Sequence, residues 1–304
     1  DDLVLNYTTT TIPPKKAFFP PEETLFRFGA GNPPELSPVE EETPFVLVGI
    51  HPCDLSAIDA LDRAYAYPPP DGRWQHNRGR AFLIGIDCIP DEYCFCESLG
   101  VSRTRRPCDL FLMETDRGYL VEIHTRAGAE ILEEAAADDV VEEDFLDAED
   151  RCRQKALGMK GRMETNPDRL ADLLEAGSFQ EIWEDIASRC YSCGSCNTTC
   201  PACFCFTIED DFNWDLKSGV RRRAWDSCQL ADFAVIAGGH RFRGERWERV
   251  RHRWYRKFLY LHRRFGRPFC TGCGRCSRAC TADINILDET NRIIAAAMKG
   301  GIHV

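Results

Sequence analysis

The sequence predicts an α/β (or α+β) N-terminal domain followed by a mainly α-helical C-terminal domain. Between residues 46 and 148, short apolar runs of strand length alternate with stretches of helical spacing. From residue 149 onward, the spacing is helical over three consecutive stretches, at 149–163, 166–176 and 178–189. Asn166–Pro167 supports the second stretch, because asparagine caps helices and proline fits the first helical turn.

Composition excludes several classes of protein. The 304 residues are 43% hydrophobic and 29% charged, a balance typical of globular proteins with a core. The longest apolar runs, such as 45–48 and 81–84, are far shorter than the roughly 18–20 residues of a membrane helix. No secretory signal is evident, and a net charge of −11 disfavours nucleic acid as the main partner. We expect a cytoplasmic protein without a membrane span.

Residues 1–45 are rich in proline, which is excluded from helix interiors and central strands. We expect an extended arm packed on the N-terminal domain, with room for one edge strand. A plain loop is the alternative.

The N-terminal domain is expected to span residues 46–148. Leu55, Ile58 and Leu61 are spaced for the buried face of one helix. Asp116–Arg117–Gly118 favours a hairpin turn. The expected elements are strands at 45–50 and 81–86, a hairpin of 109–114 and 118–124, and helices at 53–67 and 127–137.

Residues 138–150 form a strongly acidic run, at which we place the domain boundary. A solvated helix face is the alternative. The C-terminal domain then covers residues 149–304.

Cysteine is the most informative residue type. The chain holds 17 cysteines, although a chain of this length can fold on its apolar core without disulfides. Closely spaced cysteines in such a chain more often bind metal. The spacing C-x2-C-x2-C-x3-C occurs twice, at 190–200 and again at 270–280.

This repeated spacing is the pattern of ferredoxins with two [4Fe–4S] clusters, in which each motif gives three ligands to one cluster and its fourth cysteine to the other. We therefore expect a ferredoxin-like domain with two neighbouring clusters. Paired zinc sites are the alternative, although they usually show two separated C-x2-C pairs. The expected ligand sets are Cys190, Cys193, Cys196 and Cys280 for the first cluster, and Cys270, Cys273, Cys276 and Cys200 for the second.

A third group of cysteines lies in the N-terminal domain. Cys53 opens a predicted helix after one strand, and Cys88, Cys94 and Cys96 follow the next strand. Adjacent strands that end at one edge would bring the four thiols together, and helix N-terminal amides favour negative charge there. We expect a third [4Fe–4S] cluster, which would raise the iron content to about 12 atoms per chain. Buried free thiols and zinc are the alternatives.

The remaining cysteines have no motif. Cys203, Cys205 and Cys228 are expected to pack beside the clusters, with a further site as the alternative. Cys108 and Cys152 are isolated in the sequence and are expected to be structural.

Residues 241–267 are strongly basic, with eleven lysines and arginines in 27 residues and interleaved aromatics. Nucleic-acid binding and a plain solvated helix are alternatives. We expect a helix whose cations offset the negative charge of the clusters and contact an acidic partner protein.

No nucleotide-binding motif is apparent. Gly29-Ala30-Gly31 begins like a dinucleotide loop, but Pro33–Pro34 cannot enter the helix that should follow. We expect this chain to hold no nucleotide or flavin of its own.

Several longer phrases resemble the iron–sulfur beta subunits of cytoplasmic sulfhydrogenases, the NAD(P)-linked nickel–iron hydrogenases, whose wider family includes one component of the anaerobic sulfite reductases. The resemblance covers nearly the whole chain. His51 departs from it, since arginine is expected there; a surface or capping histidine is our interpretation. The phrases are YTTTTIPPKK (7–16), ETLFRF (23–28), GIHPCDLSA (49–57), CFCESLG (94–100), GYLVE (118–122), CPACFCF (200–206), WDSCQLADFAVIAGG (225–239) and CTGCGRC (270–276).

The resemblance implies a non-catalytic electron-transfer subunit in a hetero-oligomer. It implies a flavin subunit that oxidises NAD(P)H on one side and a catalytic or electron-accepting partner, of hydrogenase or sulfite reductase type, on the other. It also implies that Cys53, Cys88, Cys94 and Cys96 form the N-terminal cysteine motif of the family. A subunit of another flavin-linked reductase complex is an alternative of the same kind. An iron–sulfur protein of nucleic-acid metabolism and a zinc-stapled scaffold are the rival hypotheses.

Overall fold

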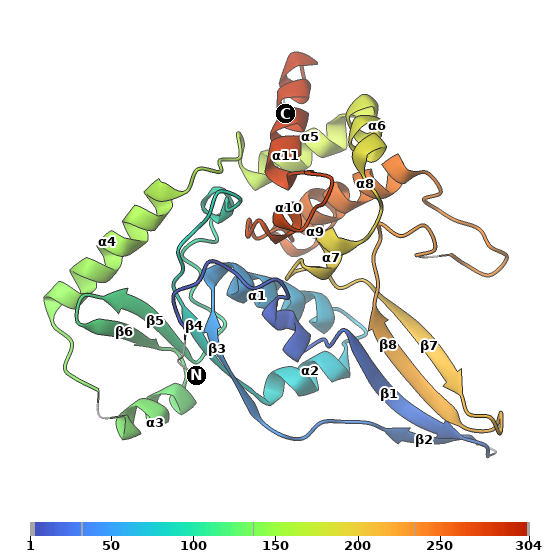
Figure 1. Ribbon diagram of the computed structural model, residues 1–304, viewed down its shortest axis with the longest axis horizontal. Helices are drawn as coiled ribbons and strands as arrows, with labels where there is room; N and C mark the ends of the chain where they lie inside the picture. Colours follow the sequence, from blue (N-terminus) through green and yellow to red (C-terminus); the bar gives the residue numbers. More distant parts are fainter. Residues whose placement is uncertain (1–3, 32, 136, 234, 303–304) are drawn as a thin grey trace.

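Two four-stranded sheets organise the chain, as Figure 1 shows for this computed structural model. The structure describes residues 4–31, 33–135, 137–233 and 235–302. The sheets lie on opposite sides of the view, and the ferredoxin motifs lie in the helical region above them (Figure 1). None of the helices in these ranges is both long and apolar enough to cross a membrane.

The first sheet has the order β3-β4-β5-β6. The first three strands are parallel neighbours, and β5 and β6 form an antiparallel hairpin. Helices α1 and α2 connect β3 to β4. The bounds are β3 (Phe45–Ile50), α1 (Pro52–Ala66), α2 (Gly72–Gly79), β4 (Ala81–Ile86), β5 (Leu110–Thr115), β6 (Gly118–Ile123) and α3 (Arg126–Glu134).

The helices packed with this sheet can be compared with the elements that the sequence predicts. Leu55, Ile58 and Leu61 of α1 are at most 1% exposed, so the predicted apolar face is the buried one. Helix α2 was not predicted; it begins where the Asp71 side chain accepts a hydrogen bond from the Trp74 amide at 2.9 Å. The expected mixture of α and β structure in the N-terminal part is confirmed.

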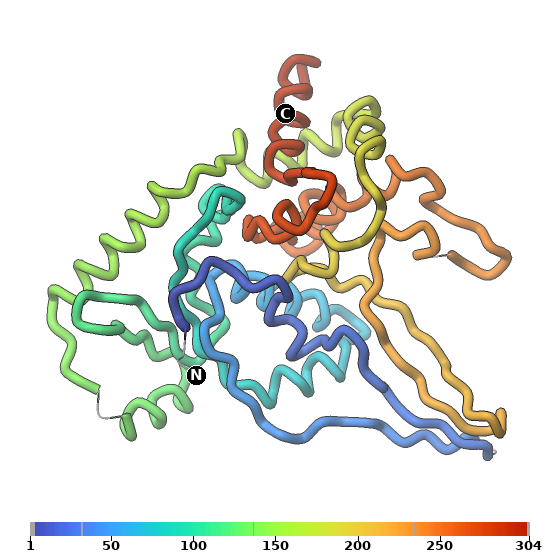
Figure 2. The backbone as a smooth tube through the Cα atoms, viewed as in Figure 1, coloured from blue at the N-terminus to red at the C-terminus, as the bar shows by residue number. Residues whose placement is uncertain are grey.

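The second sheet joins the proline-rich arm to residues that lie between the two ferredoxin motifs. Its order is β2-β1-β8-β7, and all its strands are antiparallel. Figure 2 shows the two segments running side by side. The bounds are β1 (Glu22–Gly29), β2 (Glu35–Pro38), β7 (Phe206–Phe212) and β8 (Gly219–Trp225). Because β7 and β8 interrupt the helices, the expectation of a mainly helical second half is not confirmed.

The arm is held by burial as well as by strand pairing. A short 3₁₀ turn at Pro14–Ala17 leads into Phe18 and Phe19, both fully buried. Arg223 of β8, 3% exposed, pairs with Glu23 of the facing strand at 2.6 Å. The arm therefore contacts residues from both halves of the chain.

The acidic run lies mostly in helix α4 (Glu142–Gly158). Glu142, Glu143 and Asp144 occupy its first turn, where negative charge interacts favourably with the helix dipole. Ala148 is 3% exposed and belongs to the same apolar cluster as residues of the first sheet. Residues 142–150 thus form a helix with a solvated face.

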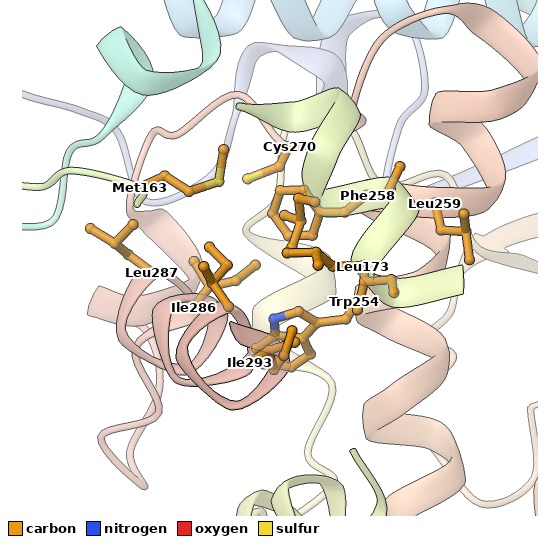
Figure 3. Packing of buried hydrophobic residues seen from close by; sticks show 14 of the residues in the cluster. Met163, Leu173, Trp254, Phe258, Leu259, Cys270, Ile286, Leu287 and Ile293 are labelled. Carbon is orange, nitrogen blue, oxygen red and sulfur yellow. The ribbon is translucent and has the colours of Figure 1, made fainter. Parts of the chain in front are cut away.

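Helices build the core around the ferredoxin motifs. Trp254, Phe258, Ile293 and Leu173 are at most 2% exposed and pack together (Figure 3). Most of the basic stretch, from Arg246 to Phe265, forms α8, a π-helical segment and α9 in direct succession, whereas residues 241–245 are not helical. The bounds are α5 (Pro167–Ala176), α6 (Gln180–Arg189), α8 (Arg246–Tyr255), the π-helical segment Arg256–Tyr260, α9 (Leu261–Phe265) and α11 (Ile286–Lys299).

Candidate functional site

The two cysteine motifs fold in the same way. In each, a glycine of positive φ ends the cysteine loop and starts one turn of helix: Gly194 before α7 (Ser195–Thr198), and Gly274 before α10 (Arg275–Arg278). Glycine reaches this left-handed conformation without the steric cost of a side chain. The sequence repeat is therefore a structural repeat.

The first predicted ligand set lies around one cavity. Cys190, Cys193 and Cys196 come from the first motif, and Cys280 reaches the same cavity from the second. Cys276 also contributes to its wall. Cys193 is the exposed member of this set. The chain thus brings the fourth cysteine of one motif to the first three of the other, as reciprocal ligation requires.

The second predicted set lies beside the first. Burial raises the pKa of Cys270 to about 12, and negative charge on Cys276 and Cys200 contributes to the rise. Burial likewise raises the pKa of Cys273, again with contributions from Cys200 and Cys276. The four sulfurs therefore lie close enough for charge on one to act on another. Thiols in such surroundings ionise only when positive charge compensates for desolvation.

The N-terminal cysteines also come together. Cys53 lies in the first turn of α1, Cys88 follows β4, and Cys96 begins a 3₁₀ turn that ends at Leu99. Cys53, Cys94 and Cys96 are all less than 10% exposed and pack with Met159. Burial raises the pKa of Cys88 to about 11.

The predicted convergence at one sheet edge therefore occurs. Burial raises the pKa of Cys94 to about 12, and the thiol of Cys88 contributes to that rise. Cys88 and Cys94 also raise the pKa of Cys96. The four sulfurs are thus mutual neighbours at the carboxyl ends of β3 and β4.

The three cysteine groups adjoin one another in a row. The Phe95 amide donates a hydrogen bond to the Gly272 carbonyl at 2.8 Å, and Cys273 packs against the N-terminal group. A Cβ atom on Gly272 would lie 2.5 Å from the Cys96 Cα. At its other end, the second set shares Cys276 with the wall of the first cavity. The N-terminal group therefore touches the second set, which touches the first.

Buried cations surround the sulfurs. Lys257 is 4% exposed, and its Nζ donates to the Cys200 Sγ at 3.0 Å. Arg275 is 2% exposed and donates to both carboxylate oxygens of Asp54 at 2.7 Å. Arg253 is 5% exposed, and its Nε and Nη2 have no hydrogen-bond partner within the described ranges. A buried cation without an anion is costly, so Lys257 and Arg253 fit sites that carry negative thiolate clusters.

Comparison with known proteins agrees with this chemistry. Residues 189–284 match the family described as a 4Fe-4S dicluster domain. The chain is 38% identical over 294 residues to the sulfhydrogenase 2 subunit beta of Pyrococcus furiosus, a match that covers 95% of this chain and 86% of that protein. The chain belongs to the sulfhydrogenase beta-subunit family. No solved structure matches it.

Membership in the sulfhydrogenase beta-subunit family confirms the predicted resemblance. It also confirms the prediction of an iron–sulfur electron-transfer subunit of hydrogenase type that works in a hetero-oligomeric complex. The dicluster match supports [4Fe–4S] clusters as the cofactor of this beta-type subunit.

His51 occupies the N-cap position of α1, but it is not a surface histidine. It is fully buried, stacks on Tyr7 with ring centroids 4.2 Å apart, and makes no side-chain capping hydrogen bond. Burial lowers its pKa to about 4. The ring is therefore neutral near neutral pH and packs beside the N-terminal cysteine group.

Cys108 and Cys152 belong to none of the three sets, although Cys152 bonds to the neighbour of Cys88. Both are buried and bond to protein groups, Cys108 to the Arg105 carbonyl at 2.9 Å and Cys152 to the Asp87 carboxylate at 3.4 Å. These contacts are those of structural thiols.

Sequence reasoning missed two buried cations, Lys15 and Arg275, whose hydrogen-bond partners are distant in the sequence. Lys15 is 3% exposed, and its Nζ donates to the Cys203 carbonyl at 2.7 Å. Nothing in the proline-rich arm indicates that a lysine there reaches the ferredoxin region. Arg275 lies inside the second motif, yet its partner Asp54 follows Cys53 in the other half. The only sequence signal was that both charges adjoin predicted ligands.

Proposed function

We propose that this chain carries electrons through three [4Fe–4S] clusters, from a flavin subunit that oxidises NAD(P)H to a catalytic subunit of the nickel–iron hydrogenase type, or in reverse. The row of three adjoining cysteine groups is the observation that carries the proposal. Neighbouring clusters suit electron hopping, whereas an isolated structural cluster needs no neighbour.

The proposed ligands follow the groups described above. Each set supplies four thiolates, the number that a [4Fe–4S] cluster takes. The first cluster takes Cys190, Cys193, Cys196 and Cys280, the second takes Cys270, Cys273, Cys276 and Cys200, and the third takes Cys53, Cys88, Cys94 and Cys96.

A bound cluster supplies one-electron transfer, and the side chains of the chain set the conditions for it. Lys257 holds a positive charge against the sulfur of Cys200, which favours the more negative, reduced state. Arg253 places its guanidinium beside the first cavity. The apolar residues around the motifs exclude water and so strengthen both effects.

The two ends of the row differ in their surroundings. Cys193 is exposed at the first cavity, so a partner can approach that cluster directly. At the other end, Cys88 lines an open cavity of about 400 Å³ together with Tyr7 and Lys155. In the proposed cytoplasmic complex, the flavin subunit contacts one end and the catalytic subunit contacts the other.

The test is anaerobic isolation of the complex under mild conditions, with metal analysis and EPR of the reduced protein. We expect nickel in a co-purifying subunit, and iron–sulfur signals that NAD(P)H produces only while the flavin subunit is present. Sirohaem in place of nickel would redirect the proposal to sulfite reduction. A colourless chain that dithionite cannot reversibly bleach would refute it.

A variant separates the third cluster from the ferredoxin pair. Replacing Cys53 and Cys96 by alanine is expected to remove about four iron atoms and to leave the signals of the pair. The matched control is the double replacement of Cys108 and Cys152, two buried thiols outside all three sets. An unchanged iron content in the first variant would remove the N-terminal site from the proposal.

A further inference from the structure

Two cysteines outside the proposed ligand sets share a cavity of their own. Cys205 and Cys228 line it together with Asn197, Arg253 and Cys203. Cys228 is 3% exposed, and Cys205 is of intermediate exposure. The ferredoxin motifs and the N-terminal group leave both thiols without a role.

The strand register explains why these thiols meet. Phe206 of β7 faces Trp225 of β8, and the Asp226 amide donates a hydrogen bond to the Cys205 carbonyl at 3.0 Å. The residues just before β7 and just after β8 are therefore neighbours. As a result, Cys205 and Cys228 line the same cavity, although the two residues are distant in the sequence.

The surroundings of Cys228 favour a thiolate. The Asn197 Nδ2 donates to its Sγ at 3.0 Å, and the Gln229 Nε2 lies 3.7 Å from the same sulfur. The neighbouring Cys205 thiol and the hydrogen bonds from Asn197 and Gln229 lower the pKa of Cys228 to about 5 in spite of its burial. The neighbouring Cys228 and burial raise the pKa of Cys205, so the cavity favours one thiolate beside one thiol.

The pair adjoins the proposed clusters. Asn197, which donates to Cys228, directly follows the first-cluster ligand Cys196 in the chain. Arg253 lines both this cavity and the cavity of the first ligand set. Lys257 lines this cavity too and donates to the second-cluster ligand Cys200 at 3.0 Å. One residue thus separates the thiol pair from each cluster of the ferredoxin pair.

The number of thiols distinguishes this cavity from a further cluster site. Three cysteines line it, fewer than the four thiolates that a [4Fe–4S] cluster takes. Cys205 and Cys228 lie at the ends of two paired strands and line the cavity together. A thiolate beside a thiol is the arrangement that thiol–disulfide chemistry uses. Cys203 lines the same cavity, but its neighbour is the proposed ligand Cys200, which together with burial raises the pKa of Cys203.

We propose that Cys205 and Cys228 form a redox-active dithiol that exchanges electrons with the ferredoxin pair. The inference rests on the proposed function, because the clusters serve as the electron acceptors. On oxidation, the Cys228 thiolate and the Cys205 thiol form one S–S bond and release one proton and two electrons. The electrons pass singly to two oxidised clusters, each of which is reduced by one. Reduced clusters drive the reverse step, which restores the thiol and the thiolate.

The test is peptide mapping of the anaerobically isolated full chain after alkylation, once with oxidised clusters and once after dithionite. We expect a peptide linked through Cys205 and Cys228 in the oxidised sample and two alkylated cysteines in the reduced one. A reductive titration of Cys205→Ser should consume two electrons fewer per chain than the wild type. The control Cys108→Ser should titrate as the wild type does.

Free thiols at both positions in the oxidised sample would overturn the dithiol and leave the proposed function standing. A lower iron content in Cys205→Ser than in the wild type would also overturn the dithiol, because the thiols would then be cluster ligands. If the variant does not fold, the peptide map of the unaltered chain decides alone. Failure of the proposed function has a different signature, a chain without iron in the ferredoxin pair.

Discussion

At the scale of single residues, buried charges next to sulfur are the main determinants of what each site can do. Lys257, Arg253 and Arg275 are each at most 5% exposed. Their cost of burial is offset only where negative charge lies within a few ångströms. Asp54 provides that charge for Arg275, and the cysteine groups provide it for Lys257 and Arg253 once they are loaded with clusters.

Lys257→Met is expected to lower the reduction potential of the second cluster by on the order of 50 mV, because the variant removes a charge and a hydrogen bond from the Cys200 sulfur. A redox titration followed by EPR measures the shift. Lys160→Met removes an exposed lysine and should change nothing. Equal potentials in the two variants would show that Lys257 does not tune the cluster.

His252 provides a pH prediction. Burial, with Arg243 and Arg256, lowers its pKa to about 4 from 6.5. Between pH 6.5 and 4 the unfolded chain binds a proton that the folded chain does not, so stability falls as the pH falls through this window. At pH 5 we expect about 1 kcal/mol of this loss in the wild type, after discounting for solvent, and none in His252→Gln. Melting temperatures of the wild type and of His252→Gln at pH 7 and pH 5 measure this loss of stability. An equal decrease in both proteins would contradict the prediction.

At the scale of elements, the loop of the second motif must approach the N-terminal cysteines closely. Gly272 has a φ of +67°, and a Cβ atom there would meet the backbone of Cys96 at 2.5 Å. Backbone atoms cannot move aside as a flexible side chain can. Gly272, like Gly274 against Tyr93, therefore permits the contact between the second and third cysteine groups.

Gly272→Ala is expected to destabilise the chain by about 2–5 kcal/mol and to reduce its iron content, because positive-φ strain and overpacking add. Gly266→Ala is the matched control: its φ is +70°, but its Cβ would meet no atom within 4 Å. The control should lose only about 1–2 kcal/mol. Thermal melting and iron analysis compare the two, and equal losses would argue against the close approach.

At the scale of the whole molecule, the two halves are joined by buried contacts. The Arg275–Asp54 pair and the Phe95–Gly272 hydrogen bond link the second motif to the first sheet, and β1 pairs with β8 across the chain. Breaking a buried ion pair by removing one partner costs about 3–5 kcal/mol. Neither half is expected to melt alone.

Thermal unfolding should therefore be a single transition. Tryptophan fluorescence, which reports on Trp74 in one half and Trp183 and Trp254 in the other, should change at the same temperature as the visible absorbance of the clusters. Two separated transitions would show that the halves unfold independently. Asp54→Asn should lower the common midpoint more than Asp172→Asn, whose ion pair with Arg263 is exposed.

The sequence alone determined the features that depend on local spacing. The two C-x2-C-x2-C-x3-C motifs, the buried face of α1 and the Asn166 cap of α5 could be predicted, because each depends on residues a few positions apart. The tertiary structure alone decided the pairing of β1 with β8, the burial of His51, the contact of Arg275 with Asp54, and the meeting of Cys205 with Cys228. These depend on packing between segments distant in the chain, which local spacing does not encode.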